Sequence, residues 1–164
     1  MSAHKGNALP WLLLSLFVIA LDQATKYIAL TALQPLVSYE VIPGFLSWTL
    51  AFNTGAAFNF LAGAAGWQRW LFAVLAIVVS SVLALWLRRT PRGDWRNAAP
   101  LALIIGGAFG NLIDRLRMGR VTDFILVYYR DWSWPAFNVA DSAISVGAVM
   151  LVLFGVLARK SMQR

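Results

Sequence analysis

Residues 67–87 have the sequence WQRWLFAVLAIVVSSVLALWL, in which Arg69 is the only charged residue. A helix needs about 20 mostly apolar residues to cross the hydrocarbon core of a bilayer. Three further apolar segments cover residues 10–30, 98–113 and 139–158. The segments at 10–30 and 139–158 are long enough to span, whereas the segment at 98–113 is short. The pattern predicts a mainly α-helical membrane protein with four transmembrane helices.

The overall composition supports this class and narrows the possible chemistry. Of the 164 residues, 60% are hydrophobic, which is more than soluble domains usually contain. We expect one helical domain that covers residues 1–164. The chain has no cysteine and its only histidine is His4, which excludes thiolate sites, Ser-His-Asp triads and HExxH zinc sites. We therefore expect no metal or other cofactor, and carboxylates are the best candidates for acid–base chemistry.

The distribution of lysine and arginine predicts the orientation in the membrane. The net charge is +7, and the basic residues gather at the ends of the apolar segments, which indicates membrane topology rather than nucleic-acid binding. Cytoplasmic N- and C-termini would place eight of the 14 basic residues inside: Lys5, Arg88, Arg89, Arg92, Arg96, Arg159, Lys160 and Arg164.

This topology would bring four scattered acids together. The chain has only seven acidic residues, and Asp22, Asp114, Asp123 and Asp141 all lie in or beside apolar segments. A carboxylate in such a place is unfavourable unless something compensates its charge, so it is a functional hypothesis by default. In an up-down-up-down bundle, the end of the first helix, the end of the third and the start of the fourth share one membrane face. We expect these acids to cluster near the outer leaflet.

The two connections on that face have different compositions. Residues 37–60 alternate β-prone residues around a turn at Val41-Ile42-Pro43-Gly44, which predicts a small extracytoplasmic β-sheet. Its large apolar side chains would be exposed and rest on the bilayer: Phe45, Leu46, Trp48, Leu50, Phe52, Phe58 and Phe60. The connection from Asp114 to Asn138 is rich in aromatic residues, and we expect a short helix or extended pieces at the membrane interface.

Two polar groups on helices allow both a structural and a functional interpretation. Asp22 and Lys26 are four residues apart on one helix face, where they could form a local ion pair or support a site. Asn111, Asp114 and Arg115 also share a face. They could be an ion-paired helix end, or Arg115 could hold the backbone carbonyls of a bound peptide or orient a carboxylate.

A short run of glycines precedes this second group. Gly106 and Gly110 are spaced so that another helix, or less readily a substrate, can approach closely.

Asp123 and Asp141 are the strongest candidates for catalysis. Two close carboxylates that share one proton supply both a base to activate water and an acid to protonate the reacting group. Asn53 and Asn138 could hydrogen-bond to them or to a substrate carbonyl. The alternative is that Asp141 caps the fourth helix while Asp123 pairs with Arg120.

Five motifs resemble one family. In order along the chain, D-Q-A-T-K (22–26), F-N-T-G-A-A-F (52–58), G-N-L-I-D-R (110–115), V-T-D-F (121–124) and F-N-V-A-D-S (137–142) resemble the lipoprotein signal peptidases, also called signal peptidase II or aspartic peptidase family A8. The resemblance spans nearly the whole chain. It implies a bacterial inner-membrane endopeptidase that removes the signal peptide of prolipoproteins by cutting before a diacylglyceryl-modified cysteine.

The resemblance also assigns roles to residues. Asp123 and Asp141 would be catalytic, and the substrate-binding or supporting residues would be Asp22, Lys26, Asn53, Gly55, Asn111, Asp114, Arg115 and Asn138. The extracytoplasmic sheet, or cradle, would lie within residues 37–60, and a short periplasmic helix near Asp123 to Tyr129. The expected partners are the diacylglyceryl-prolipoprotein and membrane lipids, with no nucleic acid, and we expect a monomer.

Two other functions remain open on the residues alone. Intramembrane Asp and Lys could form the relay of a small transporter or proton-conducting protein, although no inverted repeat is evident. The acids could also only pair with arginines in a structural or assembly subunit.

Overall fold

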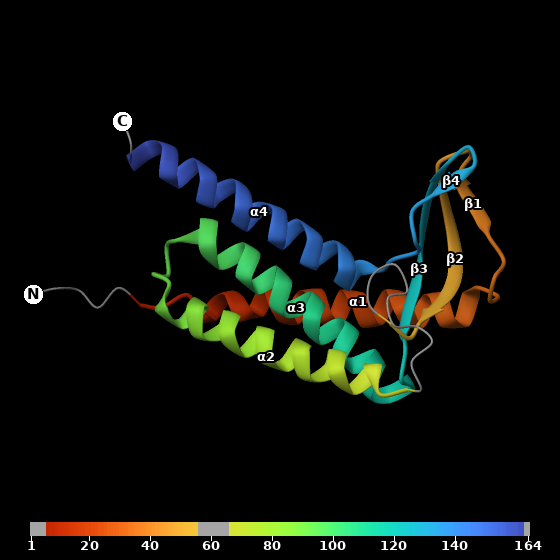
Figure 1. Ribbon diagram of the computed structural model, residues 1–164, viewed down its shortest axis with the longest axis horizontal. Coiled ribbons are helices and arrows are strands. Elements are labelled where there is room, and N and C mark those ends of the chain that lie inside the picture. Colours follow the sequence, from red (N-terminus) through yellow and green to blue (C-terminus); the bar gives the residue numbers. More distant parts are fainter. Residues whose placement is uncertain (1–5, 56–65, 163–164) are drawn as a thin grey trace, which may run out of the picture.

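Four long helices lie side by side and a small β-sheet covers one end of them (Figure 1). This computed structural model describes residues 6–55 and 66–162. The helices are α1 (Leu12–Ala32), α2 (Gln68–Arg89), α3 (Trp95–Met118) and α4 (Val139–Met162), with a 3-10 turn, η1 (Leu9–Trp11), before α1. Each long helix is apolar enough to cross a membrane. The predicted number of transmembrane helices is therefore confirmed within the described residues.

Helix α3 is longer than predicted and lies at the centre of the bundle. It has 24 residues because its polar ends, outside the apolar stretch 98–113, are also helical. Asp94 caps the first turn by accepting a hydrogen bond from the backbone N–H of Asn97 at 3.3 Å, and Gly119 ends the helix with a φ of 72°. Of its most apolar stretch 61% is buried, against 28% or less for the other helices.

Small residues allow α3 to approach its neighbours closely. A Cβ atom added to Gly106 would lie 2.8 Å from Cβ of Val18 on α1, and one added to Gly107 would overlap the carbonyl of Ala140 on α4. A Cβ atom added to Gly110 would lie 2.6 Å from Oδ2 of Asp22. The glycines thus serve helix packing, as predicted, and also make room for a carboxylate.

The sheet is antiparallel, with the strand order β1-β2-β3-β4. Its strands are β1 (Tyr39–Ile42), β2 (Leu46–Asn53), β3 (Val121–Tyr129) and β4 (Trp132–Ser133). The hairpin of β1 and β2 confirms a turn at Pro43 and Gly44, where Gly44 has a φ of 74°, but the turn extends to Phe45, and Val41 and Ile42 of the predicted turn belong to β1. However, the predicted range 37–60 contains only half of the sheet, because β3 and β4 follow α3. Residues 56–60 lie outside the described residues.

The expected short helix near Asp123 to Tyr129 is wrong, because these residues belong to β3. The sequence V-T-D-F-I-L-V-Y-Y is rich in β-branched and aromatic residues, which fit a pleated strand. Strand β3 pairs with β2 from Leu46↔Val127 to Asn53↔Val121 and with β4 at its other edge. These pairings satisfy backbone groups on both sides of the strand.

One of the apolar side chains expected on the surface of the sheet is buried. Phe45 and Trp48 are exposed at 50% and 37%, whereas Leu50 is only 3% exposed. The pairing of β2 with β3 is irregular between Trp48 and Ala51, so Thr49 and Leu50 are both buried instead of alternating. A β-bulge has this effect because it adds a residue to one strand. Phe58 and Phe60 lie outside the described residues.

The helix ends follow the predicted up-down-up-down arrangement. Figure 1 shows the end of α1, the end of α3 and the start of α4 beside the sheet, and the start of α1 and the end of α4 at the opposite end of the bundle. Strand β3, which carries Asp123, therefore lies against the helix ends that carry the other three acids.

Candidate functional site

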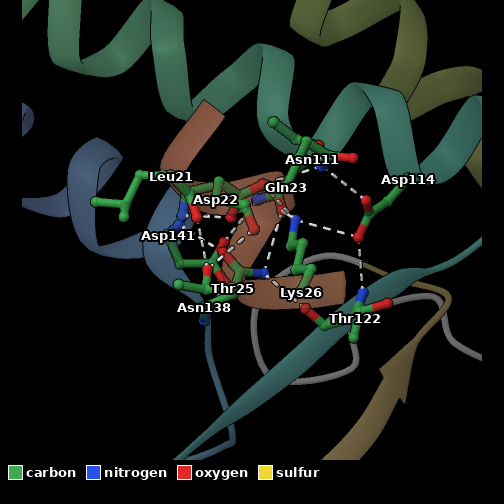
Figure 2. Close-up of polar contacts among 12 residues, drawn as sticks. Leu21, Asp22, Gln23, Thr25, Lys26, Asn111, Asp114, Thr122, Asn138 and Asp141 are labelled. Carbon is green, nitrogen blue, oxygen red and sulfur yellow. Dashed lines mark hydrogen bonds and ion pairs between the residues drawn. The ribbon is translucent and has the colours of Figure 1, made fainter. Parts of the chain in front are cut away.

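The four acids predicted to cluster meet at the sheet end of the bundle, each from a different element. Figure 2 shows Asp22 on α1, Asp114 on α3 and Asp141 on α4 pointing into one polar network. Asp123 joins this network from β3. Asp22, Asp114 and Asp123 are almost fully buried, with exposures of 0%, 2% and 3%. The proximity of the four acids predicted from topology is confirmed.

A single lysine compensates two of these carboxylates. Nζ of Lys26 lies 2.9 Å from Oδ2 of Asp22 and 3.1 Å from Oδ2 of Asp114. Its third contact is a 3.0 Å hydrogen bond to Oδ1 of Asn111. The predicted Asp22–Lys26 pair is confirmed, but it is part of a buried three-helix network rather than a local surface pair.

Both carboxylates also accept hydrogen bonds from backbone groups of other elements. Oδ1 of Asp22 accepts from the N–H of Ala140 at 2.9 Å, and Oδ2 of Asp114 accepts from the N–H of Thr122 at 3.0 Å. The first contact joins α1 to the start of α4, and the second joins α3 to the start of β3. Each thus orders a segment that carries another acid.

Asn138 caps α4 and contacts both remaining acids. Its backbone N–H donates to Oδ2 of Asp141 at 3.2 Å, while its Oδ1 accepts from the backbone N–H of Asp141 at 2.9 Å. This is a reciprocal capping box in which Asn138, rather than Asp141, is the N-cap. Nδ2 of Asn138 also donates to Oδ1 of Asp123 at 2.7 Å. One buried residue therefore connects the strand acid, through its side chain, to the helix acid, through its backbone N–H.

Asn111 gives a second connection across the site. Its Nδ2 donates to Oδ1 of Asp141 at 2.8 Å. Its Oδ1 accepts from Lys26 at 3.0 Å and from Nδ2 of Asn138 at 3.2 Å. Asp141 thus receives hydrogen bonds from α3 and from the residue that caps its own helix.

Arg115 fixes the chain just after β2. Its Nη2 donates to the carbonyl of Gly55 at 3.1 Å, and its Nη1 donates to the carbonyl of Asn111 at 3.4 Å. The side chain of Asn53 accepts from the N–H of Gly55 at 2.9 Å. In this structure Arg115 holds a carbonyl of the protein itself, and its binding of a peptide stays a prediction.

Burial changes the acidity of Asp123. Its pKa is raised to about 7, first by desolvation and second by the negative charge of Asp141. Hydrogen bonds from Asn138 and Asn53 and the positive charge of Lys26 lower it in part. A carboxyl group with this pKa can hold or release a proton near neutral pH, as general acid–base catalysis requires.

Arg120, the alternative partner predicted for Asp123, contacts Phe52. The guanidinium of Arg120 lies over the ring of Phe52, 3.6 Å from its centroid.

Within the described residues, no three His, Cys, Asp or Glu side chains are grouped so that they could hold a metal ion.

The sequence interpretation missed Gln23. Its Nε2 lies 3.0 Å from Oδ1 of Asp114, 3.2 Å from Oδ2 of Asp22 and 3.2 Å from the carbonyl of Gly110. Gln23 directly follows Asp22 and therefore does not share its helix face, so the i,i+4 pattern does not indicate it. The available signal was the amide itself, which is unfavourable in an apolar helix unless it is hydrogen-bonded.

The comparisons with known proteins agree on a single family. A family model described as "Signal peptidase (SPase) II" matches residues 14–157. A protein named lipoprotein signal peptidase from Pseudomonas putida is 55% identical over 98% of this chain and 94% of its own. One of the same name from Xylella fastidiosa is 54% identical over 94% of this chain and 92% of its own.

Solved structures agree with these matches. A structure described as a bacterial membrane enzyme, determined by the in meso method at 2.3 Å resolution, is 31% identical and superposes with a TM-score of 0.84. The match covers 99% of this chain and 96% of that one. A second bacterial membrane enzyme, determined at 1.9 Å, is 32% identical with a TM-score of 0.78, over 92% of this chain and 96% of its own.

Proposed function

Because the chain belongs to the signal peptidase II family, we propose that Asp123 and Asp141 are its catalytic pair. The family consists of aspartic peptidases that remove signal peptides from prolipoproteins, and this is the function of the chain, a multi-pass bacterial membrane protein. The family match decides against the transporter and the assembly subunit. The proposal concerns which residues perform the cleavage, on which substrate and on which side of the membrane.

The observation that carries the catalytic assignment is that Asn138 donates a hydrogen bond to each of the two carboxylates. Its side-chain Nδ2 donates to the carboxylate of Asp123 and its backbone N–H donates to the carboxylate of Asp141, so one residue contacts two acids that come from different elements. Charge repulsion between two such carboxylates disfavours double ionisation, which accords with the raised pKa of Asp123. Because the two groups titrate together, the proton is assigned to the pair.

The pair can hydrolyse a peptide bond in two proton transfers. The ionised carboxylate removes a proton from water, and the resulting hydroxide forms a bond to the carbonyl carbon of the scissile peptide. The protonated carboxyl group then gives its proton to the leaving amine as the C–N bond breaks. One acid has gained a proton and the other has lost one, so the pair ends with a single shared proton, as it began.

The surroundings support a lipid-modified substrate at the outer leaflet. The sheet beside the site exposes Trp48, Tyr129 and Trp132, and Phe45 and Trp134 are exposed directly beside its strands. Aromatic rings of this kind favour the membrane interface. We therefore propose cleavage before a diacylglyceryl-modified cysteine whose lipid stays in the bilayer beside the helices.

The remaining expectations belong to the same proposal. Arg88, Arg89, Arg92 and Arg96 lie around the α2–α3 connection, at the end of the bundle away from the sheet, which supports cytoplasmic termini and a periplasmic site. We propose that the chain acts as one monomeric domain. Asp22, Lys26, Asn53, Gly55, Asn111, Asp114, Arg115 and Asn138 would support or line the site.

A gel-shift cleavage assay with a diacylglyceryl-modified precursor tests the catalytic assignment. Asp123→Asn and Asp141→Asn keep the size of the side chain but cannot exchange a proton, so each should lower kcat by about 10²–10⁴-fold. Asp131→Asn is the matched control, because Asp131 is exposed in the turn after β3 and lies outside the site. Unimpaired cleavage by either site variant in folded protein would contradict the assignment.

A further inference from the structure

The contacts of Asp22 and Asp114 follow one pattern. Asp22 accepts a hydrogen bond from the N–H of Ala140, the residue immediately before Asp141. Asp114 accepts one from the N–H of Thr122, the residue immediately before Asp123. Each buried carboxylate thus holds the backbone one residue ahead of one member of the catalytic pair.

Both carboxylates also contact the same cation, the ammonium group of Lys26. Nζ of Lys26 lies 2.9 Å from Asp22 and 3.1 Å from Asp114, and its exposure is only 2% (Figure 2). Its third bond, to Oδ1 of Asn111, continues through Nδ2 of Asn111 to the carboxylate of Asp141. A displacement of the ammonium would therefore reach both members of the pair.

The burial of these groups makes the arrangement stiff. Two carboxylates and one ammonium are stable away from water only when their hydrogen-bonding capacity is used. Here the lysine has three acceptors, and each carboxylate accepts from the lysine and from a backbone N–H. Loss of one member leaves another charge unpaired, so the network favours a single geometry.

We propose that Lys26, Asp22 and Asp114 are positioning residues that set the separation of Asp123 and Asp141 by holding the backbone before each of them. The proposal rests on the assignment of Asp123 and Asp141 as the catalytic pair. Strand β3 and helix α4 are separate elements, and two reacting groups must be held to within about 0.5 Å of their productive geometry. The network joins the strand to the helix through the two groups that bridge Asp22 and Asp114, Nζ of Lys26 and Nε2 of Gln23.

The first test compares single and double variants of the two carboxylates. A misplacement of about 1 Å can lower the rate by about 10²-fold, so Asp22→Asn and Asp114→Asn should each lower kcat by about this factor with little change in KM. Because both carboxylates share the bridging groups of Lys26 and Gln23, the double variant should also lose about 10²-fold, whereas independent contacts would multiply to about 10⁴-fold.

A second pair of variants keeps both negative charges, so that a loss of rate cannot be explained by an unpaired buried lysine. Asp22→Glu and Asp114→Glu still pair with Lys26, but the longer side chain shifts the held N–H. Each should lower kcat by about tenfold or more, within the loss of about 10²-fold that a misplacement of about 1 Å causes, and leave KM near its native value. The added methylene should lower the melting temperature moderately, while the unfolding transition stays cooperative and shows that the variant is folded. Asp131→Glu, the same change at an exposed site, is the control and should cleave normally.

The pH profile gives a readout that a purely structural role would not move. The charged groups that act on Asp123 are Asp141 on α4, Lys26 on α1 and Arg115 on α3. Because the charge of Lys26 lowers the pKa of Asp123, whose loss of a proton limits activity at high pH, Lys26→Met should move the basic limb of kcat to higher pH. Lys26→Arg keeps the charge and should leave that limb in place.

Each outcome distinguishes the two proposals. Three results would overturn the positioning role. These are a normal kcat in the Glu variants, rate losses that multiply in the double Asn variant, and an unchanged pH profile in Lys26→Met. Normal cleavage by Asp123→Asn or Asp141→Asn would overturn the catalytic assignment instead.

Discussion

At the scale of single residues, the site holds a buried hydroxyl that the network does not use. Oγ1 of Thr122 is buried and has no hydrogen-bond partner among the described residues, although the backbone N–H of the same residue is held by Asp114. An unpaired buried polar atom costs about 1–3 kcal/mol. Thr122→Val removes this atom, keeps the shape of the side chain and leaves the backbone contact intact.

We therefore expect Thr122→Val to retain cleavage and to unfold at the same or a higher temperature. Ser15→Ala is the matched comparison, because Oγ of Ser15 is buried but donates to the carbonyl of Ala102 at 2.7 Å. Its loss should destabilise the protein by about 1 kcal/mol. Thermal unfolding in detergent checks both. A fall in stability for Thr122→Val as large as that for Ser15→Ala would show that the hydroxyl does have a partner.

Asp123 should also make stability depend on pH. Its pKa is about 7 in the folded protein and near 3.8 when unfolded, so between these values the folded state binds more protons. Stability should then decrease as the pH rises from about 4 to above 7. Asp123→Asn cannot ionise and removes this contribution.

The variant Asp123→Asn should therefore unfold at a higher temperature than the native protein at pH 8, with a smaller difference at pH 4. Each 1 kcal/mol corresponds to about 2–4 °C for a chain of this length. A gain in melting temperature together with lost cleavage would be the expected exchange of stability for function at an active site. A gain that is the same at both pH values would contradict the assigned ionisation.

At the scale of elements, the packing of α1 against α3 depends on Gly110. A Cβ atom there would lie 2.6 Å from Oδ2 of Asp22, the carboxylate that pairs with Lys26. Gly110→Ala should destabilise the protein by about 1–3 kcal/mol, as overpacking does, and should lower cleavage because it displaces Asp22. Gly155→Ala on α4 is the control, since a Cβ atom there meets nothing within 4 Å.

Gly155→Ala should be neutral or slightly stabilising, because alanine favours a helix more than glycine does. Thermal unfolding and the cleavage assay measure both variants. Equal effects of the two substitutions would mean that the close approach at Gly110 has no role.

The elements also show how far the sequence could predict this protein. Hydropathy predicts four helices, and their alternation predicts that Asp22, Asp114 and Asp141 meet at one end. The polar ends of α3 and the strand β3 could not be derived this way, because caps and pairing with β2 decide them. The hydrogen bonds to the N–H groups of Thr122 and Ala140 could not be predicted either, because almost every residue type has a backbone N–H group.

At the scale of the whole molecule, the catalytic proposal requires the sheet to lie outside the cytoplasm. The bundle has the sheet and the site at one end and the arginine-rich α2–α3 connection at the other. The excess of Lys and Arg at that second end predicts that it is cytoplasmic. The orientation can be measured without background, because the chain has no cysteine.

Two single-cysteine variants should report opposite sides of the membrane. Asp131→Cys lies in the turn between β3 and β4, and Gly93→Cys lies between α2 and α3, where a Cβ atom meets nothing within 4 Å. A membrane-impermeant maleimide added to intact spheroplasts should label Asp131→Cys, and Gly93→Cys only after lysis. Both variants should still cleave the precursor, since neither position contacts the site. The reverse labelling pattern would place the catalytic pair on the cytoplasmic side, where it could not meet a precursor lipid held in the outer leaflet.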